Sequence, residues 1–257
     1  MTRIAVGQME GRTLAEAPES LAVARSLVVE AAAQGAQIVV LPEGCYPGYV
    51  LGSAQAGREA LAQGPDPVAA FGEMAADGAV TLVAGLVLDT PEGLLNAAVT
   101  FGPDGTVLAT VAKRFLWHFD HEWFIAGSES PVAETDHGKV GALVCADARQ
   151  PAITAEMVGE GAALICDPTA WVTSTPHSPS NIQPEFLIQA RCIENGVVMA
   201  CASKAGFEGP TVAYTGRSMI VNADGEVLAE APTRGDAVMA ADVDLDGLPR
   251  PLSLIHI

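Results

Sequence analysis

Positive charge is scarce in this sequence. Only 13 Lys and Arg residues oppose 31 Asp and Glu residues, which gives a formal net charge of −18 over 257 residues. Because nucleic acid and anionic membrane surfaces attract proteins through Lys and Arg, we expect neither as a partner. The acidic surplus is typical of a protein kept soluble by charge. A basic residue beside other reactive side chains is therefore more informative than usual.

Long apolar runs and paired cysteines are also missing. Hydrophobic residues make up 49% of the chain, yet no apolar run reaches the roughly 18 residues of a membrane span, and no basic start leads into an apolar signal region. The five cysteines, an odd number without a Cys-x-x-Cys pair, argue against a disulfide framework. We therefore expect a cytoplasmic protein in a reducing setting. Its length suits one large α/β domain or two small ones.

Apolar strands and amphipathic helices alternate along the chain, but hairpins interrupt the alternation. The patterns predict helices at 67–76, 152–159 and 183–195, and an earlier one that ends at Gly35 and begins at Pro18 or at a capping box of Thr13 and Glu16. Strands are predicted at 3–9, 36–41, 79–88, 93–101, 106–112, 140–144, 162–167, 197–203, 218–221, 226–229 and 236–243. Segment 45–64 is expected to be a long functional loop. Because strands and helices alternate more strictly along the chain of a doubly wound fold, we expect instead an α/β fold with two sheets and helices on the outside.

One cysteine stands at the end of a predicted strand. The apolar run from Val140 to Val144 stops at Cys145, and small or polar residues follow at once, as far as Arg149. Taken alone, such a cysteine is more often a buried core thiol. If a helix begins here, however, its N-terminal N–H groups would lower the thiol pKa and favour a nucleophilic thiolate.

Two other reactive side chains also follow predicted strands. Glu43 lies just past one apolar strand, and Lys113 lies at the end of a hairpin. Together with Cys145 they would place an acid, a base and a soft nucleophile at one edge of the core, which is a candidate active site. Cys145 would attack, while Glu43 would take the thiol proton and later activate water. Lys113 and the backbone N–H of Ala146 would hold the charge that builds on the attacked oxygen.

These residues lie in motifs that resemble the nitrilase superfamily of carbon–nitrogen hydrolases. The resemblance runs in the family's order from residue 3 to about 243, on these segments: Leu41-Pro42-Glu43, Lys113 with its aromatic loop, Cys145-x-Asp147-x-Arg149-x-Pro151, Asp-Pro-Thr-Ala-Trp at 167–171, Ala-Arg-Cys-Ile-Glu-Asn-Gly at 190–196 and Ser-Met-Ile-Val-Asn-Ala-Asp-Gly-Glu at 218–226. It implies a four-layer αββα sandwich and a Glu–Lys–Cys triad at Glu43, Lys113 and Cys145. It also implies attack on an amide or nitrile carbon, loss of ammonia or an amine, and hydrolysis of a thioester, with no metal or organic cofactor. Such proteins commonly form dimers through helix faces, so we expect a homodimer or a higher homo-oligomer.

The chain departs from the family's usual pattern beside the lysine and the cysteine. The family often places a fourth acid, usually Glu, seven residues after the lysine; here that position is Asp120, and Glu122 follows two residues later. Spacing favours Asp120 and side-chain reach favours Glu122. We favour Asp120 and keep both as candidate substrate-binding residues. Ala146 stands where an aromatic residue or Asn is common, which would enlarge the pocket beside the sulfur. Tyr49 and Trp171 are candidates for the pocket wall, although core packing would explain either of them.

The leading interpretation is a cysteine-dependent amidase that acts on a small amide or N-carbamoyl compound and releases ammonia. A nitrilase using the same triad on a C≡N carbon is the nearest alternative, and a non-catalytic interaction module on this fold is the alternative of another class.

Residues 252–257, Leu-Ser-Leu-Ile-His-Ile, match the translation of an adaptor used in sequencing libraries. We therefore expect residues 1–251 to form a single hydrolase domain followed by a non-native tail; a natural apolar tail is the other interpretation.

Overall fold

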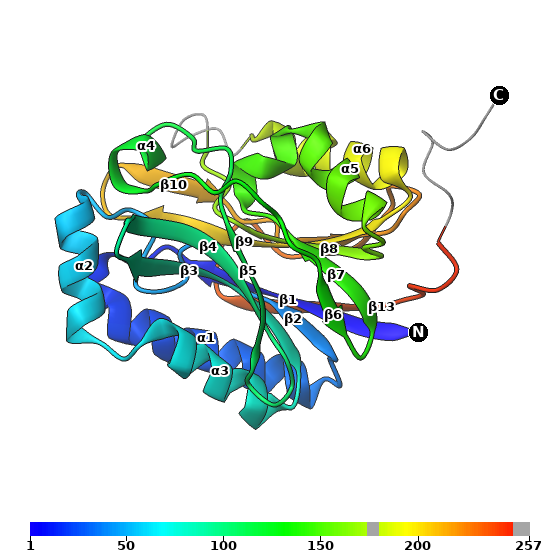
Figure 1. Cartoon of the computed structure of the whole chain (residues 1–257), viewed down its shortest axis with the longest axis horizontal. Helices are drawn as coiled ribbons and strands as arrows, with labels where there is room; N and C mark the ends of the chain where they lie inside the picture. The colour runs from blue at the N-terminus through cyan, green and yellow to red at the C-terminus, as the bar shows by residue number, and fades with distance from the viewer. Residues whose placement is uncertain (174–179, 249–257) are drawn as a thin grey trace.

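Four layers of secondary structure make up the molecule (Figure 1). The computed structural model describes residues 1–173 and 180–248. The strands form one hydrogen-bonded path that is joined at the pairing of β1 with β9. This path folds into two sheets that pack against each other, with helices on the outer face of each. The helices α1 (Ala17–Ala33) and α3 (Pro67–Gly78) cover one sheet, whereas α5 (Pro151–Gly159) and α6 (Ile188–Asn195) cover the other. This arrangement confirms the expected αββα sandwich.

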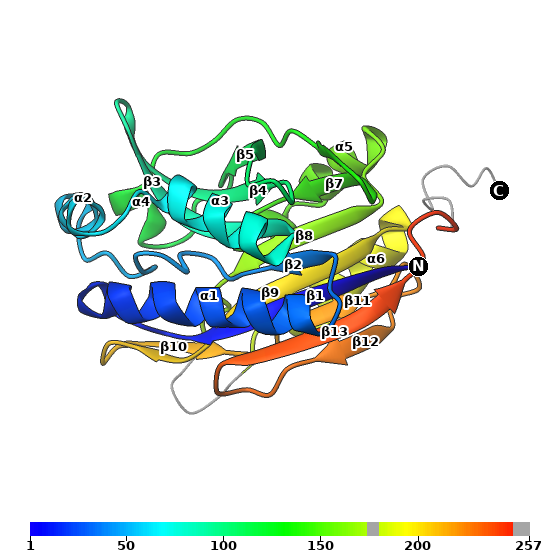
Figure 2. The same cartoon turned by 90° about the horizontal axis from the view of Figure 1, so that it is seen from below.

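The first sheet is built around β1 (Thr2–Glu10), which is buried along most of its length. Its other strands are β2 (Ile38–Val40), β3 (Thr81–Thr90), β4 (Gly93–Phe101), β5 (Val107–Ala112) and β13 (Ala237–Val243). β1, β2 and β3 are parallel, and β5 returns to their direction through two antiparallel pairings. The helices α1 and α3 lie side by side across its outer face (Figure 2).

The second sheet also has a parallel centre. Its strands are β6 (Ala133–Thr135), β7 (Gly138–Ala142), β8 (Leu164–Thr169), β9 (Val198–Glu208), β10 (Val212–Thr215), β11 (Met219–Val221) and β12 (Val227–Glu230). β7, β8 and β9 are parallel, and β9 pairs in parallel with the end of β1. The C-terminal ends of the parallel strands of both sheets therefore meet at one end of the sandwich, which is where side chains from distant segments can form a site.

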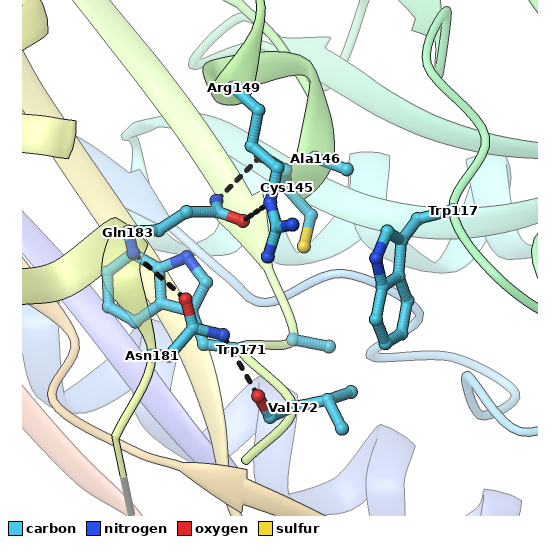
Figure 3. Close-up of a pocket in the computed structure, with 9 residues that line it drawn as sticks. Trp117, Cys145, Ala146, Arg149, Trp171, Val172, Asn181 and Gln183 are labelled. Atoms are coloured by element: carbon cyan, nitrogen blue, oxygen red, sulfur yellow. Dashed lines mark hydrogen bonds between the residues drawn. The ribbon is translucent and has the colours of Figure 1, made fainter. Parts of the chain in front are cut away.

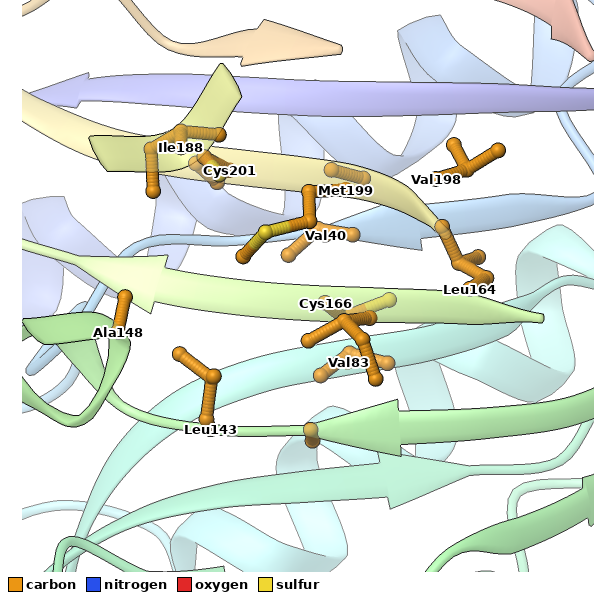
Figure 4. Packing of buried hydrophobic residues seen from close by; sticks show 14 of the residues in the cluster. Val40, Val83, Leu143, Ala148, Leu164, Cys166, Ile188, Val198, Met199 and Cys201 are labelled. Atoms are coloured by element: carbon orange, nitrogen blue, oxygen red, sulfur yellow. The ribbon is translucent and has the colours of Figure 1, made fainter. Parts of the chain in front are cut away.

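The main core lies between the two sheets (Figure 4). Val40 and Val83 from the first sheet pack toward Leu164, Cys166 and Met199 from the second, and all five are excluded from solvent. A separate cluster fills the space between the first sheet and its two helices. Central strands such as β2 and β8 are buried on both faces because each sheet is covered on both sides, which is why short continuous apolar runs marked them in the sequence.

Both predicted starts of the first helix are used. Thr13 and Glu16 form a capping box that opens a 3-10 turn, η1 (Leu14–Glu16), and Pro18 lies in the first turn of α1, which follows directly. Gly35 and Gly196, the two glycines predicted to end helices, both have a left-handed backbone: the φ of Gly35 is +81° and that of Gly196 is +59°. These are the positions where glycine has no steric penalty.

Several local predictions are wrong. Segment 45–64 is only partly a loop, because Ser53 caps the helix α2 (Ala54–Gln63) by accepting the N–H of Ala56 at 3.1 Å. Gly57 is the buried residue of that helix, so it lacks the apolar stripe that reveals a helix in sequence. The short elements α4 (Asp120–Trp123), β6 and β10 were also missed, and β7 ends at Ala142 rather than at the cysteine.

The expected tail at 252–257 lies outside the described residues. Within 1–173 and 180–248, no helix combines the length and the apolar character that a bilayer crossing would require.

Candidate active site

Glu43, Lys113 and Cys145 meet where the parallel strands end. Glu43 lies three residues past β2, Lys113 directly follows β5, and Cys145 opens the 3-10 turn η2 (Cys145–Arg149) after β7. The Lys113 ammonium nitrogen Nζ lies 2.6 Å from Glu43 Oε1, and both side chains are fully buried. Each of them also interacts electrostatically with Cys145. The fold thus brings together the three residues that the sequence analysis selected.

One oxygen of Glu43 receives all of its hydrogen bonds. Oε1 accepts from Lys113 Nζ at 2.6 Å and from Asn96 Nδ2 at 2.7 Å. Oε2 is buried and has no hydrogen-bond partner among the described residues. A buried acceptor without a partner is costly in a purely structural position, whereas a general base needs an oxygen that is free to take a proton.

Burial sets the protonation of the site. It raises the pKa of Glu43 above the ordinary 4.5, against the opposing effect of Lys113. It also raises the pKa of the Cys145 thiol well above 9.0, and the neighbouring Glu43 charge adds to that rise. For Lys113, burial disfavours the ammonium, but Glu43, Cys145 and Asp120 more than offset this and raise its pKa. The resting site therefore holds a neutral thiol beside a charged lysine.

The expected lowering of the thiol pKa by a following helix is wrong. The turn η2 that begins at Cys145 is five residues long, and the desolvation of the sulfur dominates over any effect of its N-terminus. An attack by this sulfur would therefore need a base that takes its proton as the attack occurs.

The backbone of Cys145 is held in an uncommon conformation. Its φ is +50°, a value that a residue with a Cβ adopts only at a steric cost. Both of its peptide groups are fixed: the Cys145 N–H donates to Asp167 Oδ1 at 2.7 Å, and its carbonyl accepts from Gln183 Nε2 at 2.9 Å. The N–H of Ala146 lies in the first turn of η2, where no carbonyl of the turn can accept it. It is thus available to an oxyanion.

Asp120 is the acid beside the lysine. Its Oδ2 accepts from Lys113 Nζ at 2.6 Å and from the Trp117 N–H at 2.9 Å, and its Oδ1 accepts from the Tyr49 hydroxyl at 2.9 Å. Asp120 is fully buried, whereas Glu122 is exposed. The short helix α4 brings the Asp120 backbone close to Lys113, so the longer reach of Glu122 is not needed, and the structure does not place Glu122 in the site.

A small pocket adjoins the sulfur of Cys145 (Figure 3). Its volume is about 20 Å³, enough for one water molecule. Ala146 and Trp171 line it, whereas Asp120 and Tyr49 lie behind Lys113 and contact the lysine instead. The pocket is also lined by Trp117, Arg149, Ala170, Val172, Asn181 and Gln183.

Arg149 places a cation on the pocket wall. Its Nε donates to Gln183 Oε1 at 2.8 Å (Figure 3), and its guanidinium carbon lies 5.9 Å from the centroid of the Trp117 ring. The same Gln183 donates to the carbonyl of Cys145, so one side chain positions both Arg149 and the backbone of Cys145.

Among the described residues, no group of three or more His, Cys, Asp or Glu side chains is placed to hold a metal ion.

Some site residues were missed in the sequence. Asn96 and Gln183 reach the site across 53 and 38 positions of the chain, and no local pattern marks such contacts. Asp167 and Arg149 lie within the sequence motifs that resemble those of carbon–nitrogen hydrolases. A closer comparison of these motifs with the family would have identified both as site residues.

The comparison with known families gives one match over nearly the whole chain. A family model described as carbon-nitrogen hydrolase matches residues 3–249. The omega-amidase NIT2 of Danio rerio is 32% identical over 240 residues, which cover 90% of this chain and 84% of that protein. The nitrilase blr3397 of Bradyrhizobium diazoefficiens is 28% identical over 261 residues, covering 88% and 78% of the two chains.

A solved structure shares both fold and sequence. A mutant of the amidase from Nesterenkonia sp. AN1, which shows the result of Michael addition of acrylamide at its active-site cysteine, superposes with a TM-score of 0.83 at 27% identity. The match covers 96% of this chain and 94% of that one.

Proposed function

The chain belongs to the carbon–nitrogen hydrolase family, and on that premise we propose that it hydrolyses a small amide or N-carbamoyl compound through a thioester on Cys145. The observation that carries the proposal is the buried, unpartnered Oε2 of Glu43 beside a neutral thiol. Because Lys113 and Asn96 occupy only Oε1, Oε2 is free to exchange a proton. Omega-amidases and an amidase among the similar proteins support the same reaction class.

In the first half of the reaction, Cys145 gives its proton to Glu43 as the sulfur attacks the amide carbon. Lys113 Nζ and the Ala146 N–H stabilise the negative charge on the former carbonyl oxygen. When the C–N bond breaks, Glu43 returns the proton to the leaving nitrogen, and ammonia departs. The acyl group remains on the sulfur as a thioester.

In the second half, water replaces ammonia in the site. Glu43 takes one proton from the water as its oxygen attacks the thioester carbon, and Lys113 again stabilises the oxyanion. The C–S bond then breaks, the sulfur recovers a proton from Glu43, and the carboxylic acid leaves. The raised pKa of Glu43 suits it to both roles, because a base with a pKa nearer neutrality also returns its proton readily.

The pocket favours a small acyl group. Trp117 and Trp171 line it, and Ala146 adds only a methyl group to the wall. Arg149 would attract a carbonyl or carboxylate at the far end of the acyl chain. A nitrile could enter the same pocket, and similarity to a nitrilase supports that alternative; a non-catalytic module would have no use for the unpartnered Glu43 oxygen.

Ammonia release from a panel of substrates tests the proposal. The panel contains short aliphatic amides, amides with a distal carboxylate, N-carbamoyl amino acids and the matching nitriles, each with wild-type protein and with Cys145→Ala. We expect release from one amide class that is lost in the variant. Release from nitriles alone would favour the nitrilase, and a folded, reduced protein that releases ammonia from no compound would count against an enzyme of this kind.

We further propose that the protein is a cytoplasmic homo-oligomer whose single hydrolase domain spans residues 1–251. All five cysteines are unpaired, which supports a reducing compartment. Ile182, Phe186 and Ile193 are exposed apolar side chains, the first just before η3 (Gln183–Leu187), the second in η3 and the third in α6. Such a surface is typical of an interface. Light scattering of wild-type and Phe186→Glu protein tests this: a wild-type monomer, or an assembly that the substitution leaves intact, would contradict it.

A further inference from the structure

A second buried ion pair lies outside the pocket. Lys204 Nζ and Glu208 Oε2, both on β9, are 2.6 Å apart, and their side chains are 3% and 0% exposed. The Tyr214 hydroxyl donates to the same Glu208 oxygen at 2.8 Å. Such a pair does little for stability by itself, because apolar side chains of similar size would stabilise the core as well or better. The other contacts of the Glu208 carboxylate say more about its role.

The second oxygen of Glu208 holds the loop that follows Glu43. Glu208 Oε1 accepts the backbone N–H groups of Tyr49 and Val50 at 2.8 and 2.7 Å. The loop passes so close that a Cβ on Gly48 would lie 3.3 Å from this oxygen. Both carboxylate oxygens are thereby satisfied, and the position of Tyr49 is set by a residue 159 positions away.

Tyr49 connects this anchor to the catalytic lysine. Its hydroxyl donates to Asp120 Oδ1 at 2.9 Å, and the other oxygen of Asp120 accepts from Lys113 Nζ at 2.6 Å. The Lys113 ammonium also lies over the Tyr49 ring, 5.6 Å from its centroid. A shift of the Tyr49 backbone would therefore move Asp120 and the ring together, and with them the cation that must meet the oxyanion.

We propose that Glu208 is a positioning residue for the hydrolysis: through the backbone of Tyr49 it fixes Asp120, and through Asp120 it aims Lys113 at the reacting carbon. This inference rests on the proposed function. Misplacement of a catalytic group by about 1 Å from a distant change can cost on the order of 100-fold in rate. The relay is built of hydrogen bonds whose donors or acceptors can be removed one at a time.

The test removes the acceptor without leaving a buried charge unpaired. In a Lys204→Met background, Glu208→Gln keeps an oxygen for the Tyr49 and Val50 amides, whereas Glu208→Leu has a similar shape and no acceptor. We expect the Gln protein to keep kcat within about threefold of wild type, and the Leu protein to lose about 10- to 100-fold in kcat with little change in KM. Equal kcat values for the two would overturn the proposal.

A double-variant cycle separates positioning from general destabilisation. Tyr49→Phe removes the bond to Asp120, and Tyr214→Phe is its matched control, since it also deletes one buried hydroxyl but on the Lys204 side of Glu208. Adding Tyr49→Phe to the Leu protein should lower kcat no further than the larger single loss, because both act through one path. Tyr214→Phe should change kcat by less than about twofold. Losses that multiply, or equal losses for the two tyrosines, would contradict the relay.

Alkylation of Cys145 by iodoacetamide, followed against pH by peptide mass, keeps this test independent of any substrate. Lys113 favours the thiolate, so a misaimed lysine should displace the alkylation profile toward higher pH in the Leu and Tyr49→Phe proteins and leave it unchanged in Tyr214→Phe. Absence of ammonia release from the wild type would count against the amidase alone. An undisplaced profile would overturn the role of Glu208, whatever the ammonia assay shows.

Discussion

Lys113 and Glu43 form a buried ion pair that uses one oxygen of the carboxylate and leaves the other free. Lys113 Nζ lies 2.6 Å from Oε1, which also accepts from Asn96, while Oε2 has no hydrogen-bond partner among the described residues. A second carboxylate, Asp120, holds the ammonium from the other side at 2.6 Å. The lysine is thus fixed in place, and Glu43 Oε2 is left for the proton transfer that we propose.

Cys145→Ala should abolish turnover and leave the fold intact. Only the nucleophile is lost, because the contacts that hold its backbone come from the N–H and carbonyl groups, which alanine retains. We expect kcat to fall by at least about 10³-fold, with an unchanged circular dichroism spectrum. Cys192→Ala removes another buried thiol and is the matched control, in which activity should persist. Substantial turnover by the Cys145 variant would eliminate the thioester route.

The two candidate acids should respond differently to neutralisation. Asp120→Asn removes one of the two charges that hold Lys113 and should lower kcat by about 10- to 100-fold. Glu122→Gln, on the same short helix but exposed, should change kcat by less than about twofold. Steady-state kinetics of the pair at one pH provide the comparison. Equal effects of the two substitutions would remove Asp120 from the site.

The pH dependence of kcat/KM should report Glu43 on its acid side. Burial raises the pKa of Glu43 above 4.5, so activity should be complete above that raised value and disappear as the pH falls through it and Oε2 becomes protonated. The pKa of Lys113 is raised above 10.5, so no loss of activity from lysine deprotonation is expected below that pH. An acid limb at or below 4.5 would show that another group titrates.

Asn96→Ala should move this acid limb toward higher pH. The Asn96 amide donates to Glu43 Oε1 and lowers the Glu43 pKa, so its removal favours the protonated acid. A hydrogen bond worth about 1 kcal/mol corresponds to a displacement of somewhat less than one pH unit. Thr100→Val is the matched control, a buried residue on the same strand β4, and should not displace the limb. A shift to lower pH in Asn96→Ala would contradict the assigned acceptor.

The placement of Glu43, Lys113 and Cys145 after strands could be predicted from the sequence, because the patterns that mark those strands are local. Apolar runs before Glu43 and Cys145 marked strands that end in the core, and a hairpin pattern placed Lys113 at the end of another strand. A polar residue just past a buried strand must emerge at the sheet edge. The resemblance to carbon–nitrogen hydrolases then supplied the layering of the two sheets. The choice between Asp120 and Glu122 remained open, since it depends on the four-residue turn α4, which has no periodic signal.

Contacts across the fold were beyond such reasoning. Asn96, Gln183 and Glu208 are ordinary polar residues in sequence, and their roles depend on atoms 38 or more positions away. The thiol pKa was also predicted in the wrong direction, because the burial of Cys145 is produced by packed segments from both sheets rather than by its own turn. Electrostatic environment is a property of the assembled core.

Intact-mass analysis of rapidly quenched enzyme, mixed with its best amide, tests the central claim most directly. The account predicts a transient species heavier than the free protein by the mass of the amide less that of ammonia, with the added group on the peptide that contains Cys145. Cys45 lies two residues from Glu43 and serves as the internal comparison, with its own pKa raised by burial to about 12. An adduct on any other residue, or turnover without an adduct on Cys145 even when the quench falls within the first catalytic cycle, would contradict the account.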